Sequence, residues 1–149
     1  MRQNMVKIHA VAATLALLII TTFFISTLVS ELFGDKQQIV TVKTYIFYAI
    51  WLLIPLMATT GIIGNKLAPN AKSGVIGKKK KRMPFIALNG IFILIPSAIY
   101  LRSLAIVNIF DTTFYLVQAL ELTAGLINIT LMSLNLNDGL KLRKAKQKT

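Results

Sequence analysis

Four long apolar tracts dominate this sequence, over residues 9–32, 40–63, 84–104 and 112–134. Each tract reaches the ~20 residues that a helix needs to cross a hydrocarbon layer of ~30 Å. The 149-residue chain is 55% apolar, and a single small water-soluble core cannot bury so many apolar side chains. The sequence therefore predicts an all-α fold, an integral membrane four-helix antiparallel bundle that forms one membrane domain over residues 1–149.

Basic residues gather at one end of the expected bundle. Of the 17 lysines and arginines, only Lys36, Lys43 and Arg102 lie outside the N-terminal segment, the connecting loop at 65–83 and the tail at 136–149. Segments rich in lysine and arginine stay on the cytoplasmic side of a membrane. We therefore expect both termini, the loop and the tail to be cytoplasmic. A bacterial inner membrane is the expected location, because this topology needs no import signal.

A run of basic residues ends the expected loop: Lys78, Lys79, Lys80, Lys81 and Arg82. Clustered lysines attract any polyanion, including nucleic acid. This run stands directly before an apolar tract, where basic residues commonly meet anionic lipid head groups, and no base-stacking aromatic residues accompany it. The expected partners are therefore the lipid bilayer and its anionic head groups, and not nucleic acid.

Prolines and polar residues predict where the helices bend and end. Pro55 and Pro96 each remove one backbone hydrogen bond near the middle of a tract, which predicts two kinks. Pro84 suits the first turn of the third helix, because its missing amide hydrogen has no partner there. The segment 137–139, Asn-Asp-Gly, is expected to end the fourth helix before the basic tail.

One face of the fourth tract carries nearly all of its polar side chains: Gln118, Glu121, Asn128 and Asn135. Their spacings of three and seven residues place them on the same side of a helix. Uncompensated polar groups are costly in lipid. This face is therefore expected to point into the bundle, or toward a partner that is another membrane protein or a second copy of the chain.

Glu121 is the strongest functional candidate on that face. It follows Asp111 by ten residues, hence ~15 Å along a helix, near the middle of the hydrocarbon layer. A carboxyl at this depth is expected to hold its proton unless a cation lies near, and it can then donate a hydrogen bond to Asn128 or to another helix. Two interpretations remain open: a proton or cation relay, and a neutral carboxyl that ties helices together.

Four further charged residues lie toward the outer ends of their tracts: Glu31, Lys43, Arg102 and Asp111. Two acids and two bases have balanced charges, so they can form an outer vestibule for a zwitterionic or anionic ligand. The alternative interpretation makes them interfacial anchors and helix caps.

The residue types of this chain give little support for an enzyme active site or a metal site. It has no cysteine and one histidine, His9, so neither a thiolate site nor a multi-histidine metal site forms within one chain. We identify no catalytic residue and no metal site, because no Ser-His-Asp set or phosphate-binding loop is visible. One cofactor hypothesis remains for His9, namely that it ligates a haem. The second ligand would be a methionine, or the His9 of a second copy of the chain in a dimer.

Three function hypotheses follow. The first is a non-enzymatic accessory or assembly subunit, which the polar face and the missing catalytic sets favour. The alternatives are a small proton-coupled carrier that uses Glu121 and a haem-binding electron carrier that uses His9. Any cofactor remains unidentified from the sequence.

Overall fold

The computed structural model describes residues 1–147, with side chains to residue 145. This part of the chain is almost entirely helical and contains no strand. Its elements are α1 (Arg2–Phe33), α2 (Lys36–Leu67), α3 (Gly74–Asn89), the π-helical turn η1 (Gly90–Leu94), α4 (Ile95–Ile106) and α5 (Thr112–Gln147). Because α3, η1 and α4 follow one another without a break, the chain forms four rods, and the all-α four-helix fold is confirmed.

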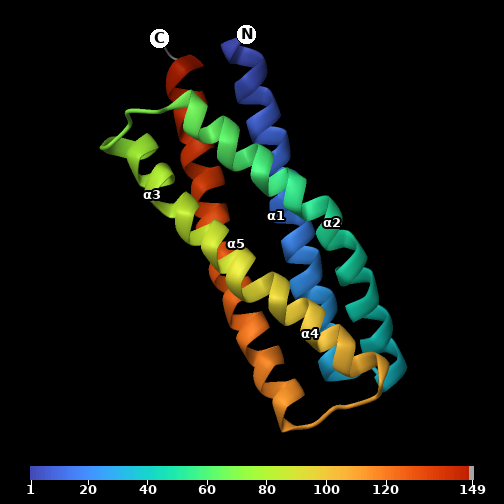
Figure 1. Cartoon of the computed structure of the whole chain (residues 1–149). Coiled ribbons are helices and arrows are strands. Elements are labelled where there is room, and N and C mark those ends of the chain that lie inside the picture. Colours follow the sequence, from blue (N-terminus) through green and yellow to red (C-terminus); the bar gives the residue numbers. More distant parts are fainter. Residues whose placement is uncertain (148–149) are drawn as a thin grey trace.

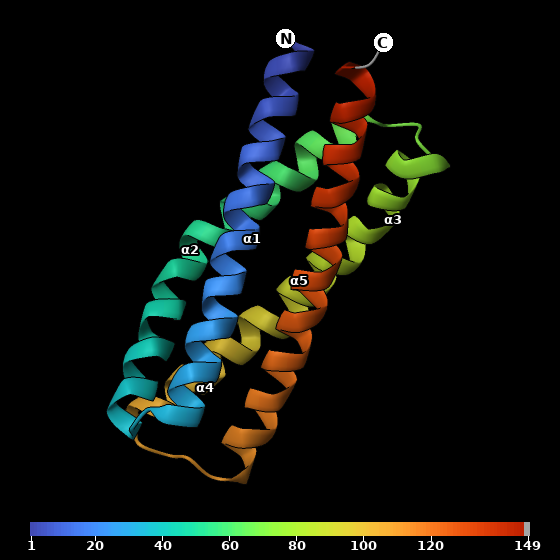
Figure 2. The same ribbon diagram turned by 180° about the vertical axis from the view of Figure 1, so that it is seen from behind.

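The four rods stand side by side in an antiparallel bundle. One layer contains α1 and α5, and the other contains α2 and the rod built by α3, η1 and α4 (Figure 1; Figure 2, seen from behind). Both termini lie at the same end of the bundle, beside the α2–α3 connection. Within the described residues, neighbouring rods pack around a square, while the diagonal partners α2 and α5 have no backbone contact.

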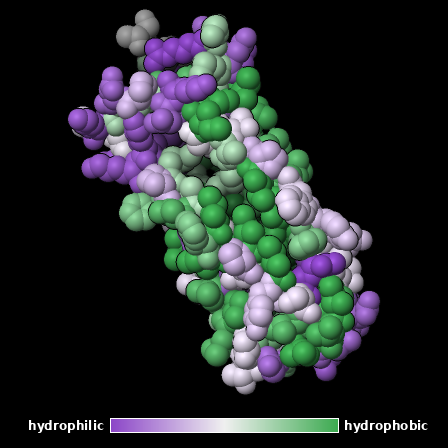
Figure 3. All heavy atoms as spheres, viewed as in Figure 1, coloured by the Kyte–Doolittle hydropathy of each residue, from purple (hydrophilic) through white to green (hydrophobic). Residues whose placement is uncertain are grey.

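The outer surface of the bundle suits a lipid environment. All four rods are long and apolar enough to cross a membrane. Large apolar side chains point outward along them, including Trp51 (68% exposed), Phe92 (70%) and Leu116 (67%). Figure 3 shows an apolar middle zone, with most of the hydrophilic residues at one end and fewer of them toward the opposite end. The chain is therefore a multi-pass membrane protein.

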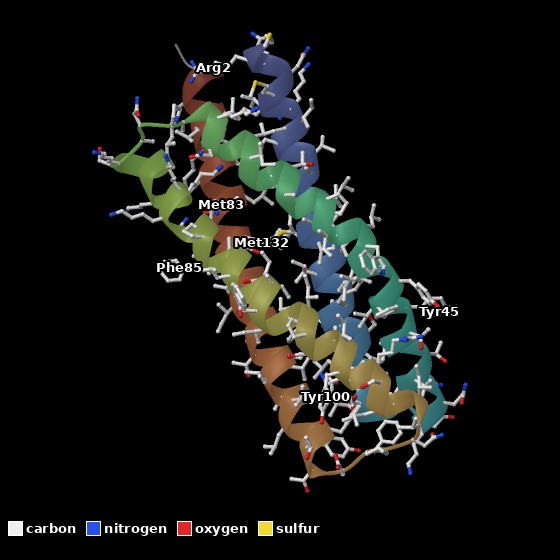
Figure 4. The ribbon with its side chains drawn as sticks, viewed as in Figure 1. Arg2, Tyr45, Met83, Phe85, Tyr100 and Met132 are labelled. Atoms are coloured by element: carbon white, nitrogen blue, oxygen red, sulfur yellow. The ribbon has the colours of Figure 1, made fainter. Side chains whose placement is uncertain are left out.

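Small and branched apolar side chains fill the interior. Ala16 and Ile20 of α1 pack with Ile86 of α3 and Met132 of α5 near the middle of the bundle. Figure 4 shows Met132 inside the bundle, whereas Tyr45 points away from it. Alanines at such contacts let helix backbones approach closely, which drives helix association in membranes.

The helices extend well beyond the apolar tracts. The prediction of a loop over residues 65–83 is wrong for its second half. The chain re-enters a helix at Gly74, so the basic run lies within α3. Pro84 consequently lies inside this helix instead of at its first turn. Lysine and arginine are good helix formers, so loss of hydropathy marks the end of an apolar span but not the end of a helix.

The fourth helix shows the same difference. The segment 137–139 was expected to stop it, yet α5 continues to Gln147. Asp138 accepts a hydrogen bond from Arg82 of α3, which holds this part of α5 against its neighbour. The last two residues of the expected tail, 148–149, lie outside the described residues.

Irregular helix geometry occurs near the middle of α2 and of the third rod. Pro55 lies inside α2, whose ribbon bends at mid-length (Figure 2). In the third rod, Pro96 directly follows η1, in which the amide of Ile95 donates to the carbonyl of Gly90. Pro96 has no amide hydrogen, and its ring crowds the carbonyl four residues earlier. The wider π-helical turn accommodates that defect.

A tight turn joins α1 to α2 at the end of the bundle opposite both termini, which is called the outer end below (Figure 1). The Gly34 amide donates to the carbonyl of Ser30, and Asp35 caps α2 by accepting from the Gln38 amide at 2.8 Å. The Gln38 side chain accepts in return from the Asp35 amide, which completes a capping box. A Cβ atom on Gly34 would lie 2.6 Å from the Ser30 carbonyl oxygen. Only glycine therefore fits this turn without a backbone shift.

We expect Gly34→Ala to lower the free energy of unfolding by about 1–3 kcal/mol, because overpacking against a backbone oxygen forces the turn to move. Gly61→Ala in α2 is the matched control, since its Cβ would meet no atom within 4 Å. The control should raise stability by up to about 1 kcal/mol through helix propensity. Unfolding of both variants in mixed detergent micelles measures the difference, and equal losses would contradict the tight turn.

Candidate functional site

A buried ion pair crosses the interior of the bundle. Lys43 Nζ of α2 lies 2.7 Å from Glu121 Oε2 of α5, and the Lys43 side chain is 0% exposed. Gln118 Nε2 donates to the same carboxylate oxygen at 2.9 Å. Since α2 and α5 occupy diagonal corners of the square, the lysine side chain spans the centre of the bundle to reach its partner.

This pair bears on two expectations from the sequence. Glu121 was expected to be protonated unless a cation lay near, and Lys43 is that cation. Lys43 was grouped with the outer charges, yet it lies seven residues into α2, ~10 Å below the helix start. Glu121 lies nine residues into α5, at ~13 Å. Both helices start at the same end of the bundle and run in the same direction, so the similar depth of Lys43 and Glu121 was a signal in the sequence that the grouping by outer ends overlooked.

A second carboxyl belongs to the same cluster. Glu31, near the outer end of α1, interacts electrostatically with both Lys43 and Glu121. Its Oε1 atom is buried and has no hydrogen-bond partner among the described residues, and the same holds for Gln118 Oε1. Glu31, Lys43, Gln118 and Glu121 are called the charge cluster below. With every group ionised its net charge is −1, so one bound proton makes it neutral.

The other two members of the expected outer group have separate roles. The guanidinium of Arg102 in α4 stacks over the Phe47 ring of α2, with 4.3 Å between Cζ and the ring centroid. Asp111 caps α5 by accepting from the Phe114 amide at 2.9 Å. The four outer charges are therefore divided: Glu31 and Lys43 join the charge cluster, while Arg102 and Asp111 serve as an aromatic-stacked cation and a helix cap.

The remaining polar residues of α5 also bond within the bundle. Asn89 Nδ2 donates to Asn128 Oδ1 and to the Ala124 carbonyl, both at 2.8 Å, and Asn128 itself is 0% exposed. Nearer the basic end, Asn135 Oδ1 accepts from Arg82 at 3.2 Å. The polar face of α5 thus points into the bundle, the first of the two orientations expected from the sequence.

An apolar cavity of about 670 Å³ adjoins the charge cluster. Its sides are α2 and the α3–η1–α4 rod, and residues of α1 and α5 form its back. Most of its lining is aliphatic or aromatic, while Glu121, Asn128 and Thr27 contribute polar atoms. Figure 3 shows the hollow on this face of the molecule, framed by apolar side chains. Glu121, the acidic residue of the ion pair, therefore also borders an apolar space.

The basic run of α3 divides between interior and surface. Lys80 donates to the carbonyls of Ala68 and Pro69 in the α2–α3 connection, and Arg82 pairs with Asp138 at 2.7 Å. Lys79 is half-buried and interacts electrostatically with Asp138. Lys78 and Lys81 are exposed. Only these two of the five expected head-group contacts are therefore fully at the surface.

His9 joins α1 to α2 near the basic end. Its Nδ1 atom donates to the Thr60 carbonyl at 3.0 Å. The ring packs on Gly64, where a Cβ atom would lie 3.0 Å from Cε1. Among the described residues, no group of three or more histidine, aspartate or glutamate side chains is arranged to hold a metal ion.

Comparisons with protein-family models, curated proteins and solved structures give no match to this chain. The contacts of the charge cluster and the cavity beside it are therefore the features from which a function can be inferred.

We expect Glu121→Gln to lower the free energy of unfolding by about 3–5 kcal/mol, because it leaves the Lys43 charge buried without its partner. The double variant Lys43→Met with Glu121→Gln removes both charges and should recover most of that loss. Unfolding of the wild type, both single variants and the double variant in mixed micelles gives the coupling free energy between Lys43 and Glu121. Strictly additive losses would show that the two groups do not interact. The same cycle with Arg82→Gln and Asp138→Asn tests a more exposed ion pair. Its coupling free energy should be smaller than that of Lys43 with Glu121.

Proposed function

We propose that this multi-pass membrane protein is a small proton-coupled carrier whose charge cluster binds and releases a proton beside the apolar cavity. The observation that carries the proposal is the contact of Glu121 with both features. Its carboxylate pairs with Lys43 at 2.7 Å, and the same residue lines the cavity. A change in the protonation of Glu121 would therefore change the wall of the cavity directly.

The composition of the charge cluster supports proton exchange. Two carboxyls interact electrostatically with one ammonium, and the contact between Lys43 and Glu121 is buried, where an unbalanced charge is costly. One proton restores neutrality, and either carboxyl can hold it. When Glu121 is ionised it pairs with Lys43 and Glu31 holds the proton; when Glu121 takes the proton, Lys43 is free to pair with Glu31. The outer position of Glu31 gives this proton a short route to water.

Helix irregularities around the cavity supply places to bend. Pro55 interrupts α2 on one side, and η1 with Pro96 interrupts the third rod on the other. In gating motions the backbone dihedral angles change mainly at a few such positions. In addition, π-helical turns often occur at functional sites. Opening and closing of the cavity at these two levels would expose its contents to alternate sides of the membrane.

The other two function hypotheses receive less support from these contacts. The polar face of α5 favoured an accessory or assembly subunit, but Glu121, Asn128 and Asn135 on that face bond to neighbouring helices of the same chain. His9 was the candidate haem ligand, and its Nδ1 atom and ring are used in the packing of α1 on α2. Both hypotheses remain predictions, and no contact of the described residues favours either of them over the carrier.

We also propose that the basic end faces the cytoplasm of a bacterial inner membrane. Support comes from the distribution of charge, since the N-terminal segment, the start of α3 and the end of α5 carry most of the basic residues. Both termini lie at that end (Figure 1). Under the positive-inside rule, the turn at Gly34 and the 107–111 connection then face outward.

Proton flux tests the carrier. Purified protein in phosphatidylethanolamine and phosphatidylglycerol liposomes is given an imposed pH gradient, and an internal pH dye reports the flux. We expect wild type to conduct, and both Glu31→Gln and the charge-neutral double variant Lys43→Met with Glu121→Gln to lose at least about 90% of the flux, because neither retains an exchangeable proton with its counter-charge. Asp111→Asn is the control, since asparagine still caps α5. Folded wild type without flux would exclude the carrier.

Labelling tests the orientation. The chain has no cysteine, so a single introduced cysteine reports its own position. In intact cells an impermeant maleimide should label Gln37→Cys at the outer turn and not Lys144→Cys near the basic end, because the reagent cannot cross the membrane. Permeabilised cells provide the control and should show both variants labelled. The opposite pattern in intact cells would show that the basic end faces outward.

A further inference from the structure

The cavity forms a long groove that follows the direction of the helices. Its α2 wall runs from Ile46 to Ile62, which corresponds to ~24 Å at the helical rise. The opposite wall runs from Ala98 back to Met83 of the third rod. Exposed wall residues such as Ile54 and Ile91 lie at the edges of the groove, so it faces the surrounding lipid. This cavity is called the lateral groove below.

An acyl chain is the ligand that fits this shape. The lining is almost wholly apolar, so water gains few hydrogen-bond partners there. The groove runs along much of the ~30 Å hydrocarbon layer, parallel to the chains of the lipids beside it. A lipid chain can therefore enter sideways from the bilayer without passing through water.

The helical register places cations at the basic end of the groove. On α2 the wall residue Ile62 is followed one turn later by Lys66, and on α3 the wall residue Pro84 is preceded one turn earlier by Lys80 and Lys81. Lys80 already binds the α2–α3 connection. Lys66 and Lys81 are exposed, so their ammonium groups are available to a ligand between the two helices.

We infer that the lateral groove binds one acyl chain of an anionic phospholipid, whose phosphate lies between Lys66 and Lys81. The apolar wall takes the chain, the two lysines select the negative head group, and the far end of the chain reaches toward Glu121. The inference concerns binding alone, so it stands whether or not the charge cluster carries protons.

Lipid retention tests the inference. Protein reconstituted in equimolar phosphatidylglycerol and phosphatidylethanolamine is released into mild detergent, and native mass spectrometry counts the lipids that remain bound. We expect one retained lipid with a preference for phosphatidylglycerol. Gly61→Phe with Ala87→Phe fills the groove from both walls and should abolish retention. Ala119→Phe, at an exposed position outside the groove, should leave retention unchanged.

Head-group selection is tested by Lys66→Gln with Lys81→Gln. This change should reduce the preference for phosphatidylglycerol by about fivefold for each lysine, because one basic residue near a membrane surface contributes about that factor. Lys7→Gln with Lys144→Gln removes the same charge from exposed positions at the same end and should leave the preference intact. Unaltered retention in the groove-filled variant, or equal retention of both lipids by wild type, would overturn the inference. A dimer that the groove-filled variant dissociates would show that a second copy occupies the groove instead.

Discussion

The diagonal ion pair between Lys43 and Glu121 sets the constraints on the rest of the bundle. A lysine with no exposed surface in a lipid-facing protein needs a counter-charge. The counter-charge of Lys43 lies on α5, whose backbone has no close contact with that of α2. Removing either partner leaves an uncompensated charge where water cannot reach it. The pair therefore fixes the rotation of α2 and α5 about their axes, since both side chains must point to the centre.

The apolar cavity follows from how the front rods run past each other. Near the outer end α2 and α4 pack closely through Ile46, Ile50 and Ala98. Toward the basic end the bend in α2 and the π-helical turn before Pro96 change the course of both rods. The space between them stays apolar because α2 and the third rod present aliphatic side chains there. Glu121 lies where the packed part meets the open part.

Polar contacts are distributed along α5 by depth. The charge cluster occupies the outer half, Asn128 bonds to Asn89 near the middle, and Arg82 bonds to Asn135 and Asp138 toward the basic end. The outer level ties α5 to α2 and the other two tie it to α3, and interhelical hydrogen bonds of this kind contribute about 1 kcal/mol each in membranes. Among the described residues, α5 therefore takes part in most of the side-chain hydrogen bonds that join different helices, and the His9–Thr60 contact joins α1 to α2 separately.

The lipid environment, the number of spans and the presence of one polar face on α5 could all be predicted from the sequence, whereas the inward direction of that face could not. The predictable features depend on hydropathy, length and helical periodicity, which are local properties. The sequence misjudged the loop at 65–83 and the end of the fourth helix, because packing against neighbours continues a helix beyond its apolar part. Only the tertiary structure decided that Lys43 pairs with Glu121, that Glu31 joins them and that a cavity adjoins the pair. The partner of a buried side chain depends on which helices lie diagonally opposite each other in the bundle. That arrangement cannot be read from local patterns, because it is set by packing between residues far apart in the chain.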